Sequence, residues 1–441
     1  MNGRTRRRPW RVAALVGAAV LLSACSAGSL GSAGGSGQGE TLDWLIGNDE
    51  STVALANALV KDFNAANQGV TVTVESRPGG AEGDNLIKTR LATGDMPDIF
   101  QYNAGSLFQA LNPQEQLTPL TGESWVGSLQ DDFRKAVTAG PDVYGAPFGA
   151  SFGGGVLYNK PLYQKLGLSV PKTWAEFMAN NAAIKAAGVD PVVQTYGDTW
   201  TSQLLVLADY HNVTAAEPTF TQQYTGGQVK YATSAAAIKG FQRLQTIHEA
   251  GYENADFASA KLEDGLRKVA TGQGGHYPML TATVIQMVQN NPEAAKDVGF
   301  FPLPGDDAAS NGVTAWLAPG IYIPKTTTGA KLDAAKKFLA WVVGPQGCET
   351  ARTAVPPPGP FSVKGCDLPA DVPAAVTDVA SYVERGASSP ALEFLSPVKG
   401  PSLEQITVEV GSGIRSAQDG AALYDEDVRK QAQQLGLPGW Q

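Results

Sequence analysis

The chain has 441 residues, of which 43% are hydrophobic and 17% are charged, so it is long enough for two α/β domains that each bury a core. Its net charge is −9, and the five arginines before Cys25 lie in a segment without acidic residues. Leaving them aside gives 28 basic against 42 acidic residues, a net charge of −14. A surface this acidic repels phosphate backbones, which excludes nucleic-acid binding.

The N-terminal segment has the three parts of a bacterial export signal. A cationic head, Arg4 to Arg11, precedes an apolar run, Val12 to Leu22, that is too short to cross a bilayer. The tetrapeptide that ends in Cys25 resembles the bacterial lipobox. The resemblance implies that residues 1–25 are a lipoprotein signal and that Cys25 is diacylated; the alternative is cleavage at a nearby alanine with Cys25 left free. Residues 26–40 are mostly Ser, Gly and Ala and predict a flexible tether.

Strands and helices alternate through the first part of the body. The patterns predict a strand at 42–46, a helix at 53–63 with Ser51 as N-cap, a strand at 70–74, a helix ending at Gly94 and a strand at 98–101. This alternation is typical of a parallel sheet with right-handed crossovers.

A second α/β pattern starts after Gly153. It contains a strand at 156–158, a capping box at 173–176, a strand at 191–195 and a helix at 237–250. A strand at 320–323 and a helix at 332–343 are predicted further along the chain. The last hundred residues are predicted to be mostly helical.

The other two cysteines, Cys348 and Cys366, flank a proline-rich stretch. In an exported chain they predict a disulfide; two buried free thiols are the alternative. Closing a loop of this size stabilises the fold by roughly 3 kcal/mol.

Several segments together resemble the extracellular solute-binding proteins (family 1) of carbohydrate import systems, which include the maltodextrin-binding proteins. The similar segments are LATGDMPDIF at 91–100, YGAPF at 144–148, LYNK at 157–160, PKTW at 171–174, GIYIPK at 320–325 and AAKKFL at 334–339. The stretch from Lys261 to Met279 departs from the family pattern, because Gln273-Gly274-Gly275-His276 stands where an apolar strand is expected.

The resemblance implies an α/β, two-lobed periplasmic-binding-protein-like fold of type II, with discontinuous domains and hinge crossings. The first lobe is expected to comprise 41–149 plus 304–350, and the second 150–303 plus 351–441. The crossings are expected near 149–154, 301–304 and 350–357, where Gly and Pro can absorb or restrict backbone rotation.

A sugar presents C–H faces and a rim of hydroxyls, so its receptor needs aromatic rings and polar side chains. In open α/β sheets such groups follow the carboxyl ends of strands. The polar candidates are Asn48, Asp49, Tyr102, Asn103 and Ser106. For Asn48 and Asp49, helix capping is an equally good explanation.

The aromatic candidates lie after a predicted strand or near a predicted crossing. Trp200 comes after the strand that ends at Thr195, Trp316 precedes the strand at 320, and Phe152 lies beside the first crossing. Tyr277 aligns loosely with an aromatic residue that the family uses for stacking. Trp44 lies within a strand and is predicted to be a core residue.

The run Gly149-Ala150-Ser151-Phe152-Gly153 matches the pattern of a hydrolase nucleophile elbow, but a strand follows Ser151 where an elbow requires a helix. We therefore expect no catalytic residue, and the three scattered histidines predict no metal site and no cofactor.

Together with the N-terminal signal, the resemblance thus implies a monomeric substrate-binding lipoprotein at the extracytoplasmic face of the cell membrane. Its expected partners are a mono- or oligosaccharide, the transmembrane subunits of an ABC permease and, through the lipid anchor, the membrane. The alternative function is a lipid-anchored carbohydrate-active enzyme, a glycoside hydrolase or lyase, which would need two opposed carboxylates. Which sugar binds stays open.

Overall fold

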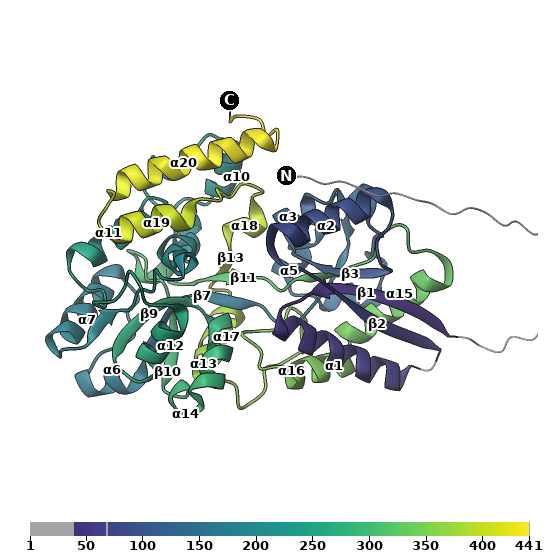
Figure 1. The fold of residues 1–441 in the computed structure, drawn as a ribbon, viewed down its shortest axis with the longest axis horizontal. Coiled ribbons are helices and arrows are strands. Elements are labelled where there is room, and N and C mark those ends of the chain that lie inside the picture. The colour runs from purple at the N-terminus through teal and green to yellow at the C-terminus, as the bar shows by residue number, and fades with distance from the viewer. Residues whose placement is uncertain (1–38, 68, 441) are drawn as a thin grey trace, which may run out of the picture. The chain divides into compact units, whose positions relative to one another are not determined.

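The computed structural model describes residues 39–67 and 69–440. The predicted signal at 1–25, the acylated Cys25 and almost all of the tether at 26–40 lie outside the described residues. Two large sheets, each in its own lobe, organise the described part of the chain (Figure 1). A third, two-stranded sheet pairs β4 (Thr138–Ala139) with β5 (Asp142–Val143). The expected two-lobed fold of type II is confirmed.

The first lobe is built on a five-stranded sheet with the order β2-β1-β3-β12-β6. Its strands are β1 (Glu40–Gly47), β2 (Val70–Arg77), β3 (Ile99–Tyr102), β6 (Gly145–Pro147) and β12 (Gly320–Tyr322). The first three run parallel, whereas β12 runs antiparallel to β3 and β6. Because β1, β2 and β3 are parallel, their carboxyl ends lie along one edge of the sheet.

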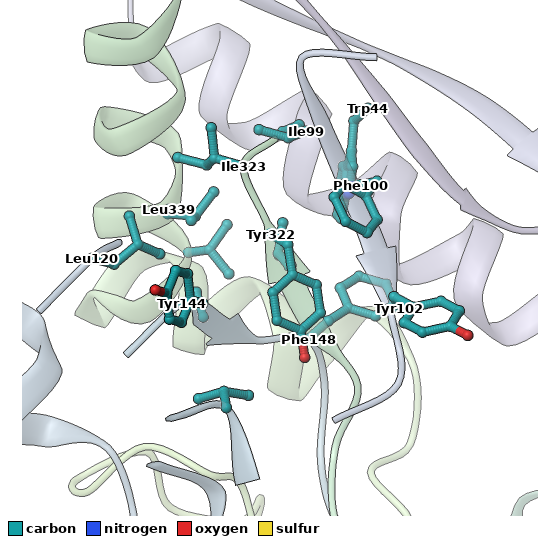
Figure 2. Packing of buried hydrophobic residues seen from close by; sticks show 14 of the residues in the cluster. Trp44, Ile99, Phe100, Tyr102, Leu120, Tyr144, Phe148, Tyr322, Ile323 and Leu339 are labelled. Carbon is teal, nitrogen blue, oxygen red and sulfur yellow. The ribbon is translucent and has the colours of Figure 1, made fainter. Parts of the chain in front are cut away.

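Helices cover both faces of this sheet. On one face, α1 (Glu50–Ala66) and α15 (Gly329–Val343) surround Trp44 on β1, whose ring meets Phe148 and Phe338 edge to face. On the other face, Phe108 of α3 (Ser106–Gln109) stacks on Tyr322. Trp44 is fully buried. Figure 2 shows Trp44, Phe148 and Tyr322 among the packed residues of this lobe. The prediction that Trp44 is a core residue is confirmed.

The second lobe is built on a six-stranded sheet. The order is β13-β11-β7-β9-β8, and β10 also pairs with β7. Its strands are β7 (Phe152–Asn159), β8 (Asp190–Val192), β9 (Gly274–Leu280), β10 (Val298–Pro302), β11 (Val313–Trp316) and β13 (Ser388–Pro390). Separate apolar clusters on its two faces contain Val156 and Leu157, neighbours on β7.

Glycines in the central strands make room for side chains from neighbouring elements. A Cβ on Gly274 would lie 2.3 Å from Val193, and one on Gly275 would lie 2.7 Å from Ile184. Within the segment at 273–276, which departs from the family's apolar pattern, Gly274 to His276 therefore form the start of β9, and side chains of adjacent elements fill the space that the glycines leave.

Helices fill the remainder of the second lobe. They include α7 (Trp174–Ala186), α8 (Leu204–Leu207), α11 (Lys239–Glu249), α12 (Leu262–Ala270), α13 (Val284–Asn290), α14 (Pro292–Ala295), α17 (Ala374–Glu384), α18 (Leu392–Leu395), α19 (Leu403–Gly411) and α20 (Ala417–Gln434). The predicted helical C-terminal part and the capping box at Thr173 and Glu176 are confirmed. In the described ranges, no helix is long and apolar enough to cross a membrane.

Two details differ from the sequence prediction. The N-cap of α1 is Asp49, not Ser51, because the Asp49 carboxylate accepts from the backbone N–H of Thr52. The strand expected at 191–195 ends at Val192. The backbone N–H of Val193 still donates to His276 of β9, but that of Gln194 donates to the side chain of Asn254 in a loop.

Two crossings between the lobes run side by side. The first passes from Phe148 to Phe152, and the second passes from Trp316 to Gly320 in the opposite direction. The second was expected near 301–304. It lies later in the chain because β10 and β11 both pair with β7, which keeps residues 304–316 with the second lobe.

The third crossing follows α16 (Pro345–Ala354), which packs on α1 and α15 of the first lobe. The predicted disulfide is present and joins Cys348 of α16 to Cys366 in the loop beyond this helix.

Candidate functional site

The carboxyl edge of the first sheet brings together residues that are distant in the sequence. Asn48 and Asp49 follow β1, and Asn103 follows Tyr102 at the end of β3. These predicted polar residues therefore lie at one edge, which faces the crossings to the second lobe. Asn48 and Asn103 are exposed, whereas Tyr102 is fully buried.

Asp49 orders the start of α1 at this edge. Its Oδ1 accepts from the backbone N–H of Thr52 and from the hydroxyl of Ser51, both at 2.9 Å. The capping role considered from the sequence is therefore present. Beside it, the side-chain oxygen of Gln101 accepts from the backbone N–H of Gly47 at 3.1 Å and fixes the end of β1 against β3.

Arg77, at the end of β2, belongs to the same edge and was not among the predicted residues. Its guanidinium lies 5.8 Å from the ring centre of Tyr102 and donates to the carbonyl oxygen of Pro78 at 3.0 Å. Burial lowers the pKa of Arg77, and Asp84 counteracts this effect. The rule that locates Asp49 and Asn103 also locates Arg77, since it follows the predicted strand at 70–74 and comes just before Pro-Gly-Gly.

Two buried polar atoms at this edge have no hydrogen-bond partner among the described residues: Nε of Arg77 and the hydroxyl of Tyr102. Burial, and then the charge of Asp84, raise the pKa of Tyr102 well above its usual range, so the phenol stays protonated. Both groups can donate a hydrogen bond to a water or to a ligand oxygen.

Aromatic rings lie where the two crossings meet. The rings of Phe152 and Trp316 stack, with centroids 6.1 Å apart and planes at 6°. Gly154 makes room for the indole, since a Cβ there would lie 2.4 Å from the Trp316 ring. The structure thus brings together two of the predicted aromatic residues.

A cavity of ≈ 230 Å³ lies between the lobes at the crossings. Three aromatic residues, Phe148, Phe152 and Phe361, line it together with Ser51 and Thr52 from the start of α1. Ala282 and Ile285 of the second lobe close the opposite side. Phe148 and Phe361 were not predicted from the sequence, because a phenylalanine beside Pro or Gly gives no pattern that places it in a cavity.

Ser106 takes part in a different contact between the lobes. Its hydroxyl donates to the carbonyl oxygen of Glu393 on α18. Gly105, just before it, approaches the main chain of Phe394 so closely that a Cβ would lie 2.4 Å from that residue's Cα. Phe394 packs against the apolar cluster of the first lobe, and Leu392 is part of the cluster of the second.

The remaining two predicted residues lie away from the cavity. Trp200 is half-buried in a short 3₁₀ helix and packs on the cluster behind β9. Tyr277 is fully buried on β9, and its hydroxyl lies 2.6 Å from the hydroxyl of Thr195. In this arrangement the ring of Tyr277 is a core element and lines no surface between the lobes.

Ser151 lacks the surroundings of a nucleophile. Its hydroxyl lies 3.2 Å from that of Ser362, and β7 follows it directly. The three histidines bond elsewhere, His211 to Ser389, His248 to Glu253 and His276 to Asn181. No group of three metal-binding side chains occurs in the described residues.

The chain is similar to known proteins over most of its length. A family model described as "Bacterial extracellular solute-binding protein" matches residues 48–347. The "Multiple sugar-binding protein" of Streptococcus mutans is 25% identical over 66% of this chain and 68% of that protein. The "Melibiose/raffinose/stachyose-binding protein MelE" of Bacillus subtilis is 22% identical over 65% of this chain and 66% of that protein.

A solved structure shares the fold. A chitin oligosaccharide binding protein superposes with a TM-score of 0.71 and 22% identity, covering 90% of this chain and all of that one. With the two lobes, the paired crossings and the match over residues 48–347, these similarities show that the chain belongs to the family of bacterial extracellular solute-binding proteins.

Proposed function

We propose that this protein captures a sugar between its lobes and delivers it to the permease of an ABC importer. The observation that carries the proposal is the interlobe cavity, lined by three phenylalanine rings and by hydroxyls at the start of α1. Aromatic rings can cover the C–H faces of a sugar while polar groups bond its hydroxyls.

The size of the cavity limits the ligand in this state. About 230 Å³ lies just below the roughly 300 Å³ at which small-molecule sites begin, so one sugar ring is the natural occupant. The names of the two curated relatives, both sugar-binding proteins, support this class of ligand. Of the predicted contacts, Phe152 lines the cavity, and Asp49 positions Ser51 and Thr52, which also line it.

The proposed mechanism is closure of the lobes around the ligand. The sugar binds to one lobe, and only contacts that form after closure shift the equilibrium toward the closed state. The closed form then presents a surface of both lobes to the transmembrane subunits. In this proposal Cys25 carries the lipid that holds the protein at the outer face of the membrane.

A thermal-shift screen of the exported protein with galactose, glucose, melibiose, raffinose, stachyose and maltotriose tests the ligand class. A sugar that binds only the folded state raises the melting temperature. We expect Phe152→Ala to weaken binding of the active sugar at least tenfold, whereas Phe257→Ala, in a half-buried ring of the second lobe away from the cavity, should not. Failure of every sugar to shift the transition would contradict the proposal.

The same incubations separate a receptor from an enzyme. A receptor releases its sugar unchanged, so chromatography after prolonged incubation should recover only the added compound. Cleaved products that persist after repurification of the protein would favour the hydrolase or lyase alternative.

A further inference from the structure

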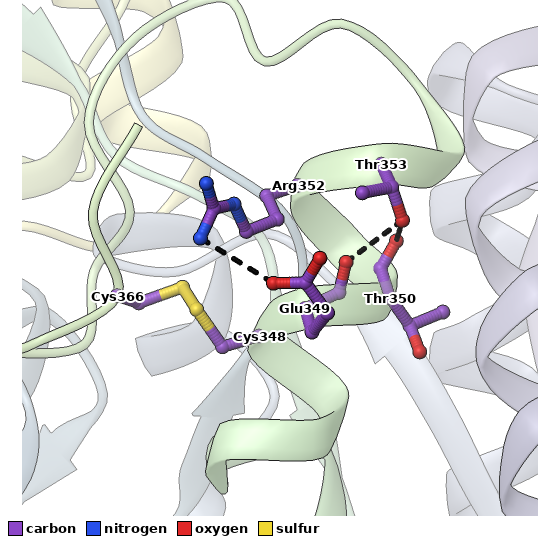
Figure 3. The surroundings of a disulfide bond; sticks show 6 residues. All are labelled: Cys348, Glu349, Thr350, Arg352, Thr353 and Cys366. Carbon is purple, nitrogen blue, oxygen red and sulfur yellow. Dashed lines mark hydrogen bonds and ion pairs between the residues drawn. A yellow bond between two sulfur atoms is a disulfide. The ribbon is translucent and has the colours of Figure 1, made fainter. Parts of the chain in front are cut away.

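The loop between Cys348 and Cys366 contacts both lobes and the first crossing. The disulfide joins the middle of α16 to a residue 18 positions later (Figure 3). Between them the chain reads Val355-Pro-Pro-Pro-Gly-Pro-Phe361, and four of these seven residues are proline. We call residues 355–366 the strap.

The second half of the strap is held by the first lobe. The backbone N–H of Gln130 donates to the carbonyl oxygen of Ser362 at 2.9 Å, and that of Lys364 donates to Ser128 at 2.7 Å. Both bonds flank a β-bridge between Leu129 and Val363. Cys366 lies at the end of this pairing, so the disulfide ties the paired segment back to α16 of the same lobe.

The first half of the strap is held by the crossing and by the second lobe. The backbone N–H of Ser151 donates to the carbonyl oxygen of Pro360 at 2.9 Å. The hydroxyl of Thr281, in the second lobe, donates to the carbonyl oxygen of Pro358 at 2.8 Å and accepts from the backbone N–H of Gly153 at 2.9 Å. Gly359 fits only as glycine, since a Cβ would lie 2.4 Å from the carbonyl oxygen of Ser151.

The strap also lines the spaces between the lobes. Val355 to Pro358 and Phe361 form one wall of the proposed sugar cavity. Phe361 and Ser362 line a second cavity, of ≈ 400 Å³, with Ser151 and Phe133. Val355 to Pro357 line a third, of ≈ 790 Å³, between α13 and α16. The position of this loop therefore sets the shape of every one of these spaces.

We infer that the Cys348–Cys366 bond is a positioning element of the sugar site: it holds the strap, and with it Phe361, in the geometry that binds ligand. The inference rests on the proposed function. A segment fixed at both ends before binding loses little conformational freedom when the ligand arrives, whereas a free segment must be ordered at that moment. Reduction of the bond should thus weaken ligand binding, while the fold of each lobe stays intact.

The test compares the exported protein with the variant C348A/C366A. Binding of each sugar from the panel above is measured by calorimetry, and hydrogen exchange of the amides of Gln130, Ser151 and Lys364 reports on the strap itself. We expect at least tenfold weaker binding and at least tenfold faster exchange at these three amides, while amides in β1 and β9 stay protected. Wild-type protein treated with a phosphine reductant should reproduce both effects.

Glu349→Ala is the matched control, since it removes the partner of Arg352 next to the disulfide and leaves the bond intact (Figure 3). It should retain wild-type affinity and exchange. Equal affinity and unchanged exchange in C348A/C366A would overturn the inference. If no sugar binds the oxidised wild type, the proposed function fails, and the exchange measurement still decides whether the bond holds the strap.

Discussion

The two lobes have the same layered architecture but differ in how their cores are built. The core of the first lobe consists of apolar and aromatic side chains around β1, and Arg77 and Gln101 are buried only at its edge. The core of the second lobe encloses an ion pair between Asp209 and Arg243 and an uncharged histidine, His276. Glycines also occupy its central strands.

This difference shows that one architecture can be stabilised in two ways. In the first lobe, burial of apolar surface stabilises the core. The loss of unfolding free energy on truncating a core side chain should therefore depend mainly on the volume removed. In the second, polar groups are satisfied inside the core, and removing one partner leaves the other unpaired at a much higher cost. The second lobe should therefore be the more sensitive to substitution and to acid.

The largest expected effect is at the buried ion pair of the second lobe. Arg243→Met leaves Asp209 buried without its cation and should cost about 3–5 kcal/mol of unfolding free energy at neutral pH. Chemical denaturation measures it. Burial already raises the pKa of Asp209 and Arg243 opposes this, so the deficit of the variant should shrink as the pH falls and Asp209 is protonated.

Lys296→Met is the control for this prediction. It removes an exposed ion pair with Glu293 at 2.9 Å, which is worth at most about 1 kcal/mol. A loss as small in Arg243→Met as in this control would contradict the proposed sensitivity of the second core.

The next largest loss of stability is expected for a substitution in the glycine-rich strand β7. Gly154→Val places a side chain 2.4 Å from the Trp316 ring and should cost about 1–3 kcal/mol in denaturant unfolding. The double variant with Trp316→Ala should cost less than the sum of the single changes, because the indole no longer fills the space. Gly122→Val, where an added Cβ meets none of the described atoms within 4 Å, should be nearly neutral.

Acid should destabilise the second lobe through His276. Its Nδ1 lies 2.7 Å from Oδ1 of Asn181, and its Nε2 lies 2.6 Å from the Tyr163 hydroxyl. Burial lowers the pKa of His276 to about 3, against roughly 6.5 in the unfolded chain. Below pH 6.5 His276 binds a proton in the unfolded chain but stays neutral in the folded protein. Protonation therefore stabilises the unfolded state, and the unfolding free energy decreases as the pH falls.

The loss is at most about 1.4 kcal/mol per pH unit, or about 2 kcal/mol between pH 6.5 and 5. Unfolding free energies of the wild type and of His276→Gln at pH 7.5 and 5.0 isolate the effect, and the variant should lose less on acidification. His248→Gln, which alters a partly exposed ring, serves as control. Parallel slopes in wild type and His276→Gln would show that this histidine does not set the acid response.

The smallest effect concerns the contact between the lobes at α3 and α18. Gly105 has a φ of 70°, and a Cβ there meets the main chain of Phe394. Gly167 has a φ of 64° with open space around it among the described residues. At either position, alanine should lower the unfolding free energy by roughly 1 kcal/mol because its backbone must adopt a positive φ. Gly105→Ala should lower it by about 1 kcal/mol more, because the added Cβ collides with Phe394.

Small-angle scattering adds a second measurement for this pair. The collision in Gly105→Ala is relieved by moving the lobes apart, so its radius of gyration should exceed that of Gly167→Ala. Identical stability and identical scattering would mean that α18 does not restrain the lobes.

Local patterns in the sequence predicted the parts of the fold that depend on neighbouring residues alone. The apolar run of β1, the capping box at Thr173 and the helix α15 followed from periodicity and capping, which act over a few residues. The position of Asp49 and Asn103 at one edge also followed, because parallel strands bring their carboxyl ends together.

Only the tertiary structure decided which element fills each space and where the chain changes lobe. The space of the missing side chains of β9 is filled by Val193 and Ile184, and the ring of Tyr277 lies against Gly265 of α12. The second crossing comes only after β11 has paired with β7. These outcomes depend on contacts between residues far apart in the chain. Their energies are set by packing and by the pairing of buried polar groups, which no local pattern records.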